Sequence, residues 1–394
     1  MYWAYPDTEI KPKNRRISYE CDFTCGGTGG HINPAIAVAN TWKERYPDSN
    51  ILFIGATGHM EEKLVPAAGY ELRTFPTAGM RRKLNLAGIK ANIQAVSNAV
   101  SAVSGCKKII KAFKPDVIVG TGGYASFPAL LAGKLMKIPT CVHEANAMPG
   151  LTTRMAAAWA DRVLICFPES AKHYKHPEKT EAVGMPVRQE FFLAQKAAAR
   201  EELGLDSRPL VVSTFGSQGA KMMNLAMADL MKLEQEAGFP WQHIHGVGSF
   251  GWEWFPDKLK ELGVDAENSG AIDMREYIYN MPTVMAAADV IISRAGASSC
   301  NEIAASGTPC VLIPSPNVTD NHQEKNARVI SDKGGAVLLL EKDCTAQRLY
   351  EEIRAILENP NRQADMAAAM KEACVPDSAQ RICNIMEQLA KAGK

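Results

Sequence analysis

Near its amino terminus the chain reads Phe23-Thr-Cys-Gly-Gly-Thr-Gly-Gly-His31, with a proline at position 34. The glycines lie where a first strand is expected to pass into a first helix. Glycine has no Cβ, so this loop can turn tightly and approach a ligand closely. We expect Pro34 in the first helical turn, where its missing N–H costs nothing. The free N–H groups and the dipole of that helix then favour a bound diphosphate.

Two further glycine loops follow, Gly120-Thr-Gly-Gly-Tyr124 and Phe215-Gly-Ser-Gln-Gly-Ala220. One such loop alone says little about function. Three loops, each placed directly after an apolar run, predict a two-lobed cleft that binds anions.

Apolar runs and helical stretches alternate along the chain. The short runs are bounded by glycine, proline or charge and fit buried parallel strands; they cover 51–54, 116–119, 139–142, 162–166, 210–215, 289–293 and 310–314. Helices are expected between them, for example over 33–46, 59–68, 89–113 and 126–136. This order predicts an α/β fold with two Rossmann-like, doubly wound domains facing a cleft, and ligands at the carboxyl ends of the strands.

The chain divides into three parts on this interpretation. Residues 1–16 are largely polar, lack the apolar core of a signal peptide and are expected to be a flexible extension. The first domain spans 17–185 and the second 186–375. The segment 181–188, with Gly184 and Pro186, is expected to be the crossing between them. A last helix near 376–392 is expected to return to the first domain, which would then include 376–394. The segment 246–275 is rich in glycine and aromatic residues and is left without an assigned structure.

Composition excludes several classes of protein. With 394 residues, 46% of them hydrophobic, 22% charged and a net charge of +1, the chain is typical of globular proteins and does not resemble a nucleic-acid binder. No apolar run of about 18 residues is present to span a membrane. The ten cysteines show no metal-binding spacing and are expected to be reduced and mostly buried.

The ordered set of motifs resembles the MurG family of peptidoglycan glycosyltransferases. The set comprises Gly26-Gly-Thr-Gly-Gly-His31, Gly122-Gly-Tyr124, His143-Glu-Ala-Asn146, Gly184-Met-Pro-Val-Arg188, Gly216-Ser-Gln-Gly-Ala220, Ser293-Arg-Ala-Gly-Ala297, Asn301-Glu-Ile-Ala304 and Asn321-His-Gln323. The resemblance covers about residues 20–390. It implies an inverting transfer of N-acetylglucosamine from UDP-N-acetylglucosamine to the C4 hydroxyl of an undecaprenyl-diphosphate-linked muramoyl pentapeptide, at the cytoplasmic face of the cell membrane.

The resemblance also implies roles for individual residues. For the donor it points to Thr28, Gly29, Gly30, Asn146, Arg188, Ser217, Ile278, Ala297, Ser298, Glu302, His322 and Gln323. For the acceptor it points to Gly27, Thr28, Gly29, Gly122, Gly123, Tyr124 and Glu144, and His31 is the candidate catalytic base. Other cell-wall synthesis proteins are further candidate partners.

Each role has a plainer structural alternative. The Glu302 carboxylate can accept two hydrogen bonds from ribose hydroxyls, or it can simply oppose a helix dipole. Arg188 presents a planar fork that suits a diphosphate, although most single arginines are surface residues. Ser217 can help hold phosphates or belong to an ordinary turn. His31 can accept a proton or only pack. Asn146 can bond sugar hydroxyls or be an ordinary turn residue. Glu144 can orient a neighbouring side chain, and Tyr124 can line the acceptor site or simply pack.

No Asp-x-Asp pair is present in the sequence, so we expect no tightly bound metal. Helix dipoles and Arg188 could do the same electrostatic work, and a Mg²⁺ effect on the acceptor diphosphate stays open.

A basic and apolar segment at 77–89 is the candidate membrane contact, through Met80, Arg81, Arg82, Lys83 and Leu84. Its alternative is a solvated loop.

Four rival functions remain at this stage. Two share the architecture: a transferase acting on another lipid, such as diacylglycerol, and a UDP-sugar epimerase. A dinucleotide oxidoreductase is disfavoured, because the first loop lacks the G-x-G-x-x-G spacing. A non-catalytic sugar-nucleotide binding module is the last.

Overall fold

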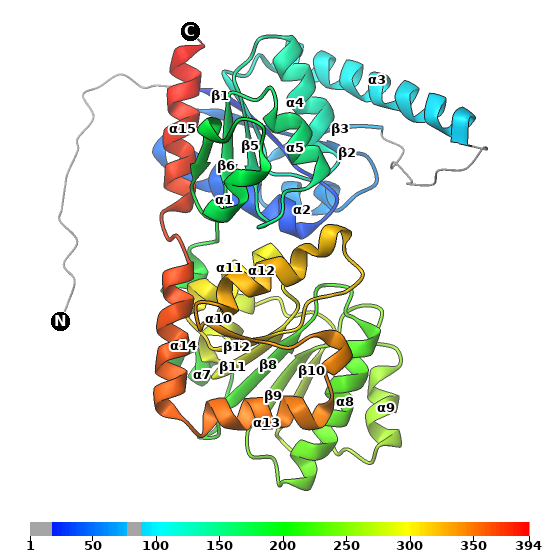
Figure 1. The fold of residues 1–394 in the computed structure, drawn as a ribbon, viewed down its shortest axis with the longest axis vertical. Coiled ribbons are helices and arrows are strands. Elements are labelled where there is room, and N and C mark those ends of the chain that lie inside the picture. Colours follow the sequence, from blue (N-terminus) through cyan, green and yellow to red (C-terminus); the bar gives the residue numbers. More distant parts are fainter. Residues whose placement is uncertain (1–17, 77–87, 394) are drawn as a thin grey trace, which may run out of the picture.

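The computed structural model describes residues 18–76 and 88–393, and for 88–98 it describes the backbone alone. It contains two parallel sheets, stacked one above the other in Figure 1. The first has seven strands in the order β3-β2-β1-β4-β5-β6-β7. These are β1 (Glu20–Thr24), β2 (Asn50–Ala56), β3 (Glu71–Phe75), β4 (Val117–Gly120), β5 (Thr140–Glu144), β6 (Arg162–Ile165) and β7 (Thr180–Ala182). Its helices are α1 (Gly29–Arg45), α2 (Glu61–Ala67), α3 (Gly88–Phe113), α4 (Ser126–Leu135) and α5 (Leu151–Ala157).

The second sheet has six strands in the order β10-β9-β8-β11-β12-β13. They are β8 (Leu210–Thr214), β9 (Gln242–Gly246), β10 (Ile272–Arg275), β11 (Val290–Ser293), β12 (Cys310–Leu312) and β13 (Ala336–Leu338). The helices that follow the crossing are α6 (Glu190–Leu193), α7 (Lys196–Glu202), α8 (Lys221–Glu236), α9 (Phe255–Glu261), α10 (Met281–Ala287), α11 (Ala297–Ser306), α12 (His322–Ser331), α13 (Ala346–Leu357), α14 (Pro360–Ala373) and α15 (Ser378–Ala392). Short 3₁₀ helices cover Pro168–His173, Pro177–Lys179, Thr319–Asn321 and Glu341–Asp343.

The predicted fold class is confirmed, since both sheets are parallel and helices connect their strands. The seven predicted runs are all strands, with ends that differ by at most two residues. The unassigned segment 246–275 holds α9 and β10. Residues 181 and 182, expected in the crossing, belong to the edge strand β7.

Each face of the first sheet packs against helices. On one face, Cys21 and Phe23 of β1 pack with α1 and α15 around the fully buried Trp42. On the other, β2 and β4 pack with α3 and α4. The last helix, α15, therefore lies beside the first sheet although it follows the whole second sheet, as Figure 1 shows. Cys383 of α15 donates a hydrogen bond to the Val38 carbonyl of α1.

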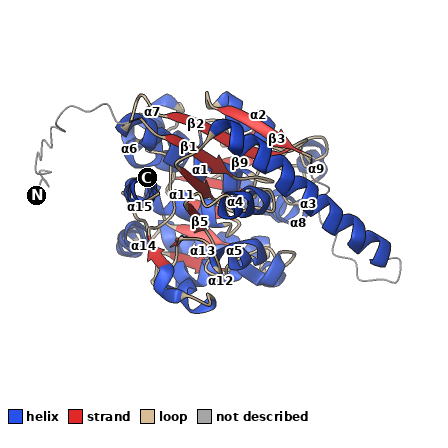
Figure 2. Ribbon diagram, turned by 90° about the horizontal axis from the view of Figure 1, so that it is seen from above, coloured by secondary structure: helices blue, strands red, loops and turns tan. Residues whose placement is uncertain are grey.

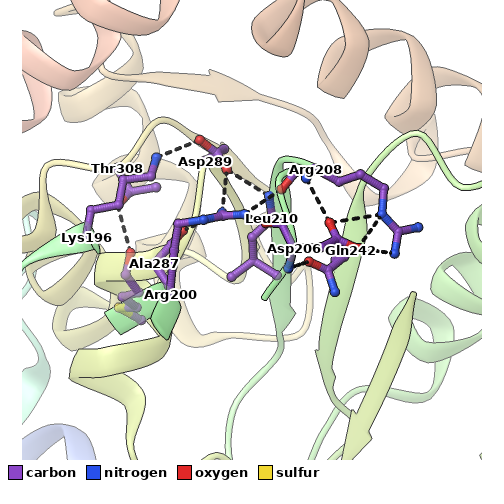
Figure 3. A network of polar contacts seen from close by, with 10 residues as sticks. Lys196, Arg200, Asp206, Arg208, Leu210, Gln242, Ala287, Asp289 and Thr308 are labelled. Carbon is purple, nitrogen blue, oxygen red and sulfur yellow. Dashed lines mark hydrogen bonds and ion pairs between the residues drawn. The ribbon is translucent and has the colours of Figure 1, made fainter. Parts of the chain in front are cut away.

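A network of ion pairs and hydrogen bonds lies at the amino ends of two strands of the second sheet (Figure 3). Asp289, just before β11, accepts hydrogen bonds from the backbone N–H of Leu210 and from the side chains of Lys196 and Arg200. Arg200 also donates to the carbonyls of Asp206 and Arg208. This network joins α7 to the amino ends of β8 and β11, so the carboxyl ends of both strands are left for the site.

Two expectations about composition can be compared with the fold. No helix of the described residues is long and apolar enough to cross a membrane. All ten cysteines are free of disulfide bonds, and all but Cys344 are buried.

Candidate active site

The predicted residues that the structure describes lie where the carboxyl edges of the two sheets face each other. The first sheet contributes the loops after β1, β4 and β5, and the second contributes the loop after β8 together with α11 and α12. The Ser298 hydroxyl of α11 donates to the Gly30 carbonyl of α1 across this boundary, at 3.2 Å. The two groups of predicted residues therefore meet across this boundary.

The first glycine loop differs from the prediction in where its helix starts. Helix α1 begins at Gly29, after an extended Thr28 at the N-cap position, so Pro34 lies inside the helix. Pro34 has no N–H to offer the carbonyl four residues earlier, which is that of Gly30. This is the carbonyl that accepts the Ser298 hydroxyl. The proline inside the helix therefore leaves the Gly30 carbonyl without its helical donor, and Ser298 of the second domain supplies one.

A buried carboxylate that the sequence did not reveal supports this loop. Glu61 is 0% exposed and accepts hydrogen bonds from the backbone N–H groups of Gly27, at 3.1 Å, and Ala56, at 2.9 Å. The Glu61-Glu62 pair at the start of a predicted helix was the available signal. It could not show which glutamate turns inward.

His31 is held by the second glycine loop. Its Nδ1 lies 3.2 Å from the carbonyl oxygen of Thr121, and the Thr121 hydroxyl donates to the His31 carbonyl at 2.7 Å. A carbonyl only accepts, so Nδ1 carries the proton and Nε2 has a free lone pair in the neutral ring. Burial lowers the pKa of His31, opposed by the Glu144 charge and the Thr121 carbonyl, and the His322 charge lowers it further. A neutral imidazole of this kind can accept a proton at neutral pH.

The close approach of this loop to His31 requires glycine. Gly122 and Gly123 have φ angles of +100° and +80°. A Cβ on Gly122 would lie 2.8 Å from His31 Nδ1, and one on Gly123 would lie 2.2 Å from the Gly26 carbonyl oxygen. Next to them, the Tyr124 hydroxyl hydrogen-bonds His59 Nε2. The two glycine loops therefore pack as one unit around the imidazole.

Glu144 organises the loop after β5. One of its oxygens accepts from the backbone and side-chain N–H groups of Asn146, and the other accepts from the backbone N–H of Gly150. The side chain is 3% exposed. These contacts favour the alternative in which Glu144 orients a neighbour, here Asn146, over direct contact with an acceptor.

Arg188 and Glu302 line a small pocket between the domains. The other lining residues are Asn33, Pro34, Met185, Pro186, Val187 and Ser298. The Arg188 guanidinium lies over the Phe191 ring, and its buried Nε has no hydrogen-bond partner in the described part of the chain. Burial raises the pKa of Glu302 to about 7, although the Arg188 charge lowers it. Glu302 is the sixth residue of α11, not at its start as expected, so the helix dipole no longer explains it.

The third glycine loop leads into α8 as predicted. Ser217 is exposed in this loop, and α8 begins at Lys221 after the N-cap Ala220. Gly219 has a φ of +76°, and a Cβ there would lie 2.2 Å from the Val247 carbonyl oxygen. The loop thus presents the exposed Ser217 hydroxyl just before a long helix, whose first N–H groups favour anions.

The remaining predicted residues have varied surroundings. The Ile278 side chain is buried against Gly246, which leaves only its backbone for a ligand. Ala297 is the buried first residue of α11. At the start of α12, His322 Nδ1 donates to the Thr319 carbonyl, and the Gln323 side-chain oxygen accepts from the Ser315 N–H.

Asn326 is the second residue that sequence reasoning missed. It is 0% exposed on α12, and its side chain contacts Asn146 and Ala147 of the first domain.

Two further predictions concern the membrane contact and a bound metal. Met80, Arg81, Arg82, Lys83 and Leu84 lie outside the described residues. Within the described ranges, no group of three or more His, Cys, Asp or Glu side chains could hold a metal ion.

Family models match most of the chain. The model of the glycosyltransferase family 28 N-terminal domain matches residues 23–165, and that of the family 28 C-terminal domain matches residues 210–382.

Several relatives carry the name UDP-N-acetylglucosamine–N-acetylmuramyl-(pentapeptide) pyrophosphoryl-undecaprenol N-acetylglucosamine transferase. The one from Acetivibrio thermocellus is 39% identical over 93% of this chain and 97% of its own length. The one from Lactococcus lactis is 37% identical over 94% of this chain and 99% of its own.

Solved structures share the fold. MurG from Acinetobacter baumannii has a TM-score of 0.71 and 24% identity, covering 93% of this chain and 99% of its own. A UDP-N-acetylglucosamine 2-epimerase has a TM-score of 0.67 and 16% identity, covering 95% of this chain and 96% of its own. At these identities the likeness concerns the fold alone.

Proposed function

The chain belongs to glycosyltransferase family 28, and we propose that it transfers N-acetylglucosamine from UDP-N-acetylglucosamine to a lipid-linked muramoyl pentapeptide. The observation that carries the proposal is the arrangement around His31. Its Nδ1 is fixed by the Thr121 carbonyl, and its helix also lines the Arg188–Glu302 pocket through Asn33 and Pro34. This geometry supports a proposal in which the base lies on the same helix that lines the nucleotide-binding pocket.

The second domain binds the donor on this proposal. The Glu302 carboxylate accepts hydrogen bonds from the ribose hydroxyls. Arg188, Ser217 and the start of α8 stabilise the diphosphate. The donor sugar lies near His322, Gln323 and Asn146. The uracil base lies near the backbone of Ile278.

The first domain binds the acceptor, with its diphosphate at the loops that contain Gly27 to Gly29 and Gly122 to Tyr124. The Gly27 N–H already donates to Glu61, so the proposal relies on the N–H groups that follow it and on those of the 122–124 loop, which glycine lets an anion approach closely.

The reaction is a single displacement at the anomeric carbon. The acceptor C4 oxygen forms a bond to this carbon while its proton passes to Nε2 of His31. The bond between the anomeric carbon and the UDP oxygen breaks at the same time, and UDP leaves with the electron pair. Positive groups aimed at the leaving diphosphate stabilise the transition state more than the ground state. Attack from the opposite face converts the α-linked donor into a β-1,4-linked product.

Charge on the leaving group needs no tightly bound metal in this scheme. The α8 dipole and Arg188 supply the compensating positive charge. A Mg²⁺ effect on the acceptor diphosphate is a separate question that activity assays with and without chelator address.

An epimerase is the structural rival, since UDP-N-acetylglucosamine 2-epimerases share the fold. Its likeness rests on 16% identity, whereas relatives at 36–39% identity over 93% of the chain carry the transferase name. We therefore prefer transfer to epimerisation.

The polyprenyl tail of the acceptor stays in the bilayer, because each buried CH₂ stabilises it there by about 0.8 kcal/mol. The enzyme must therefore come to the membrane surface to reach its acceptor. We place the protein at the cytoplasmic face of the cell membrane as a peripheral protein, within cell-wall synthesis. Association with other proteins of that process belongs to the same proposal.

One assay tests the proposed function. The purified protein is incubated with radiolabelled UDP-N-acetylglucosamine and a short-chain muramoyl-pentapeptide diphosphate lipid, and the products are separated. We expect a β-1,4-linked disaccharide lipid and stoichiometric UDP. Parallel reactions use diacylglycerol, or no acceptor at all. Sugar transfer only to diacylglycerol, or epimerised nucleotide sugar without acceptor, would contradict the proposal.

A further inference from the structure

Asn326 is a buried side chain that joins the two domains. It lies on α12 and is 0% exposed. Its oxygen accepts a hydrogen bond from the Ala147 N–H at 2.9 Å, and its nitrogen donates to Asn146 Oδ1 and to the Ala295 carbonyl, both at 3.2 Å. Two of these three partners belong to the first domain. Both N–H groups and the carbonyl of the side chain are thus used, and two of the bonds exist only while the domains are in contact.

The partners of Asn326 are themselves fixed. Asn146 directs its nitrogen to the Glu144 carboxylate, so its oxygen faces Asn326. Ala295 lies two residues before α11, the helix that carries Ser298 and Glu302. A single carboxamide therefore connects the loop after β5, the start of α11 and α12.

Apolar contacts surround this bridge. Ala145, Ala147 and Met185 pack with Ala297 in one buried cluster, against which Val329 also packs. Val329 follows Asn326 by three residues on α12, so both face the first domain. At the rim, Arg154 and Asp320 form a weak ion pair at 3.9 Å.

Helix α12 carries the two side chains assigned to the donor sugar, His322 and Gln323, in its first turn, one turn before Asn326. The position of that turn relative to the first domain depends on what holds α12 there. Packing by Val329 is non-directional, whereas the three hydrogen bonds of Asn326 fix one orientation.

We propose that Asn326 is a positioning residue that sets the donor sugar, held by the start of α12, against the acceptor side of the cleft. This inference rests on the proposed function. Asn326 does not touch the reacting atoms; it acts through Asn146 and through the orientation of α12. Losing the bridge shifts the sugar relative to His31, and misplacement of about 1 Å costs about a hundredfold in rate.

The test compares turnover with donor affinity in Asn326→Asp. This variant keeps the shape and an oxygen for Ala147, but it cannot donate to Asn146 or Ala295. We expect kcat for sugar transfer to fall by about 10- to 100-fold. The Kd for UDP, measured by calorimetry, should stay within about threefold, because Arg188 and Glu302 remain in place. Asn326→Ser adds no charge and should likewise lower kcat while the Kd for UDP stays near that of the parent. It replaces Asn326→Asp in the test if Asn326→Asp does not fold.

Ile330→Ala is the matched control. Ile330 is 3% exposed one turn further along α12 and packs only into the core of the second domain. It should lower Tm more than Asn326→Ser does, yet keep kcat within about threefold. The inference is wrong if both Asn326 variants turn over like the parent protein, or if kcat follows Tm equally in all three variants. If the parent itself transfers no sugar, the proposed function and this inference both fail.

Discussion

His31 and Glu302 are titratable side chains on opposite walls of the cleft, and burial shifts the pKa of each toward its neutral form. For a histidine this shift produces a free base, which suits proton acceptance. For a glutamate it brings the pKa to about 7, so the ribose contact that we propose for Glu302 should depend on pH near neutrality. The two residues should therefore differ in what their replacement changes.

Replacing Glu302 should weaken nucleotide binding. Glu302→Gln keeps the shape but removes the charge, and hydrogen bonds to charged groups contribute about 1.5–3 kcal/mol. We expect calorimetry to show at least about a tenfold rise in the Kd for UDP. Tm at neutral pH should not fall, because the variant removes a buried carboxyl whose raised pKa costs stability there. Because the pKa of Glu302 is raised to about 7, the parent should bind UDP more weakly below that pH, where the carboxyl is protonated.

The variant also serves as the control for this pH dependence, since UDP itself titrates in both proteins. The difference in affinity between parent and Glu302→Gln should shrink as the pH falls. A constant difference across pH, or an unchanged Kd, would contradict a ribose role for Glu302.

Replacing His31 should affect turnover rather than donor binding. General-base catalysis contributes about 10²–10⁴-fold, so His31→Gln should lower kcat at least about a hundredfold. Glutamine fills much of the imidazole volume beneath Gly122 but cannot accept the proton at neutral pH. UDP affinity should stay near that of the parent. A variant that loses UDP affinity and keeps its turnover would assign His31 to binding instead.

The sequence drew attention to residues that stand beside a local pattern. His31 follows a glycine run and Ser217 precedes a helix, although the contact that orients the His31 ring comes from Thr121, 90 residues away. Sequence reasoning missed Glu61 and Asn326, because their partners lie 34 and 179 residues away. A glutamate or asparagine on a helix has the same local signature whether it faces solvent or the core.

At the scale of elements, polar strands were the main difficulty. Strand β9 has the polar sequence QHIHG and was not predicted. Its histidines are buried because they bond to other buried side chains: His243 to Glu234 and Ser213, and His245 to Ser213. Mutual hydrogen bonding makes such a strand stable, and no period-2 or apolar pattern reveals it.

Strand β1 poses the opposite problem, because its Asp22 is buried without a hydrogen-bond partner in the described part of the chain. Burial raises the pKa of Asp22 well above its ordinary range. A buried polar group without a partner costs about 1–3 kcal/mol, so Asp22→Val should raise the free energy of unfolding by about that amount. Urea denaturation followed by circular dichroism measures it.

The pH dependence of the free energy of unfolding tests whether the buried Asp22 carboxyl is the cause of this cost. The folded chain holds a proton on Asp22 that the unfolded chain releases above its ordinary carboxyl pKa, so this residue makes stability fall as pH rises through that window. The gain from Asp22→Val should therefore grow from about pH 4 to pH 7. Asp22→Asn keeps the shape without titrating and should remove only the pH-dependent part. If the gain in free energy of unfolding is equal at both pH values, a partner must stabilise the charged form of Asp22 in the folded chain.

At the scale of the whole molecule, the two sheets lie one above the other, and α15 lies beside the first sheet (Figure 1). The alternation of strands and helices was sufficient to predict the two sheets. Their mutual arrangement depends on contacts such as Ser298 with Gly30, which no local pattern contains. Helix α3 extends away from the first sheet toward its own start at Gly88, as both Figure 1 and Figure 2 show.

The last prediction concerns the membrane and the basic residues Arg81, Arg82 and Lys83, which precede α3 and lie outside the described residues. Each basic residue near an anionic surface is worth about 1 kcal/mol. Replacing all three with Gln should therefore weaken co-sedimentation with anionic vesicles by roughly a hundredfold at low salt. High salt should weaken binding of the parent in the same way, since it screens exposed charges.

A matched variant separates this segment from net charge. Lys108, Lys111 and Lys114 are exposed at the far end of α3 and just beyond it, and replacing them with Gln removes the same charge. That variant should bind vesicles like the parent. The Arg81, Arg82 and Lys83 variant should keep UDP affinity and activity on a short-chain acceptor, and lose activity mainly on acceptor embedded in a bilayer. Equal vesicle binding by all three proteins at low salt would exclude the 77–89 segment as the docking site, because a contact that depends on three cations must weaken when they are removed.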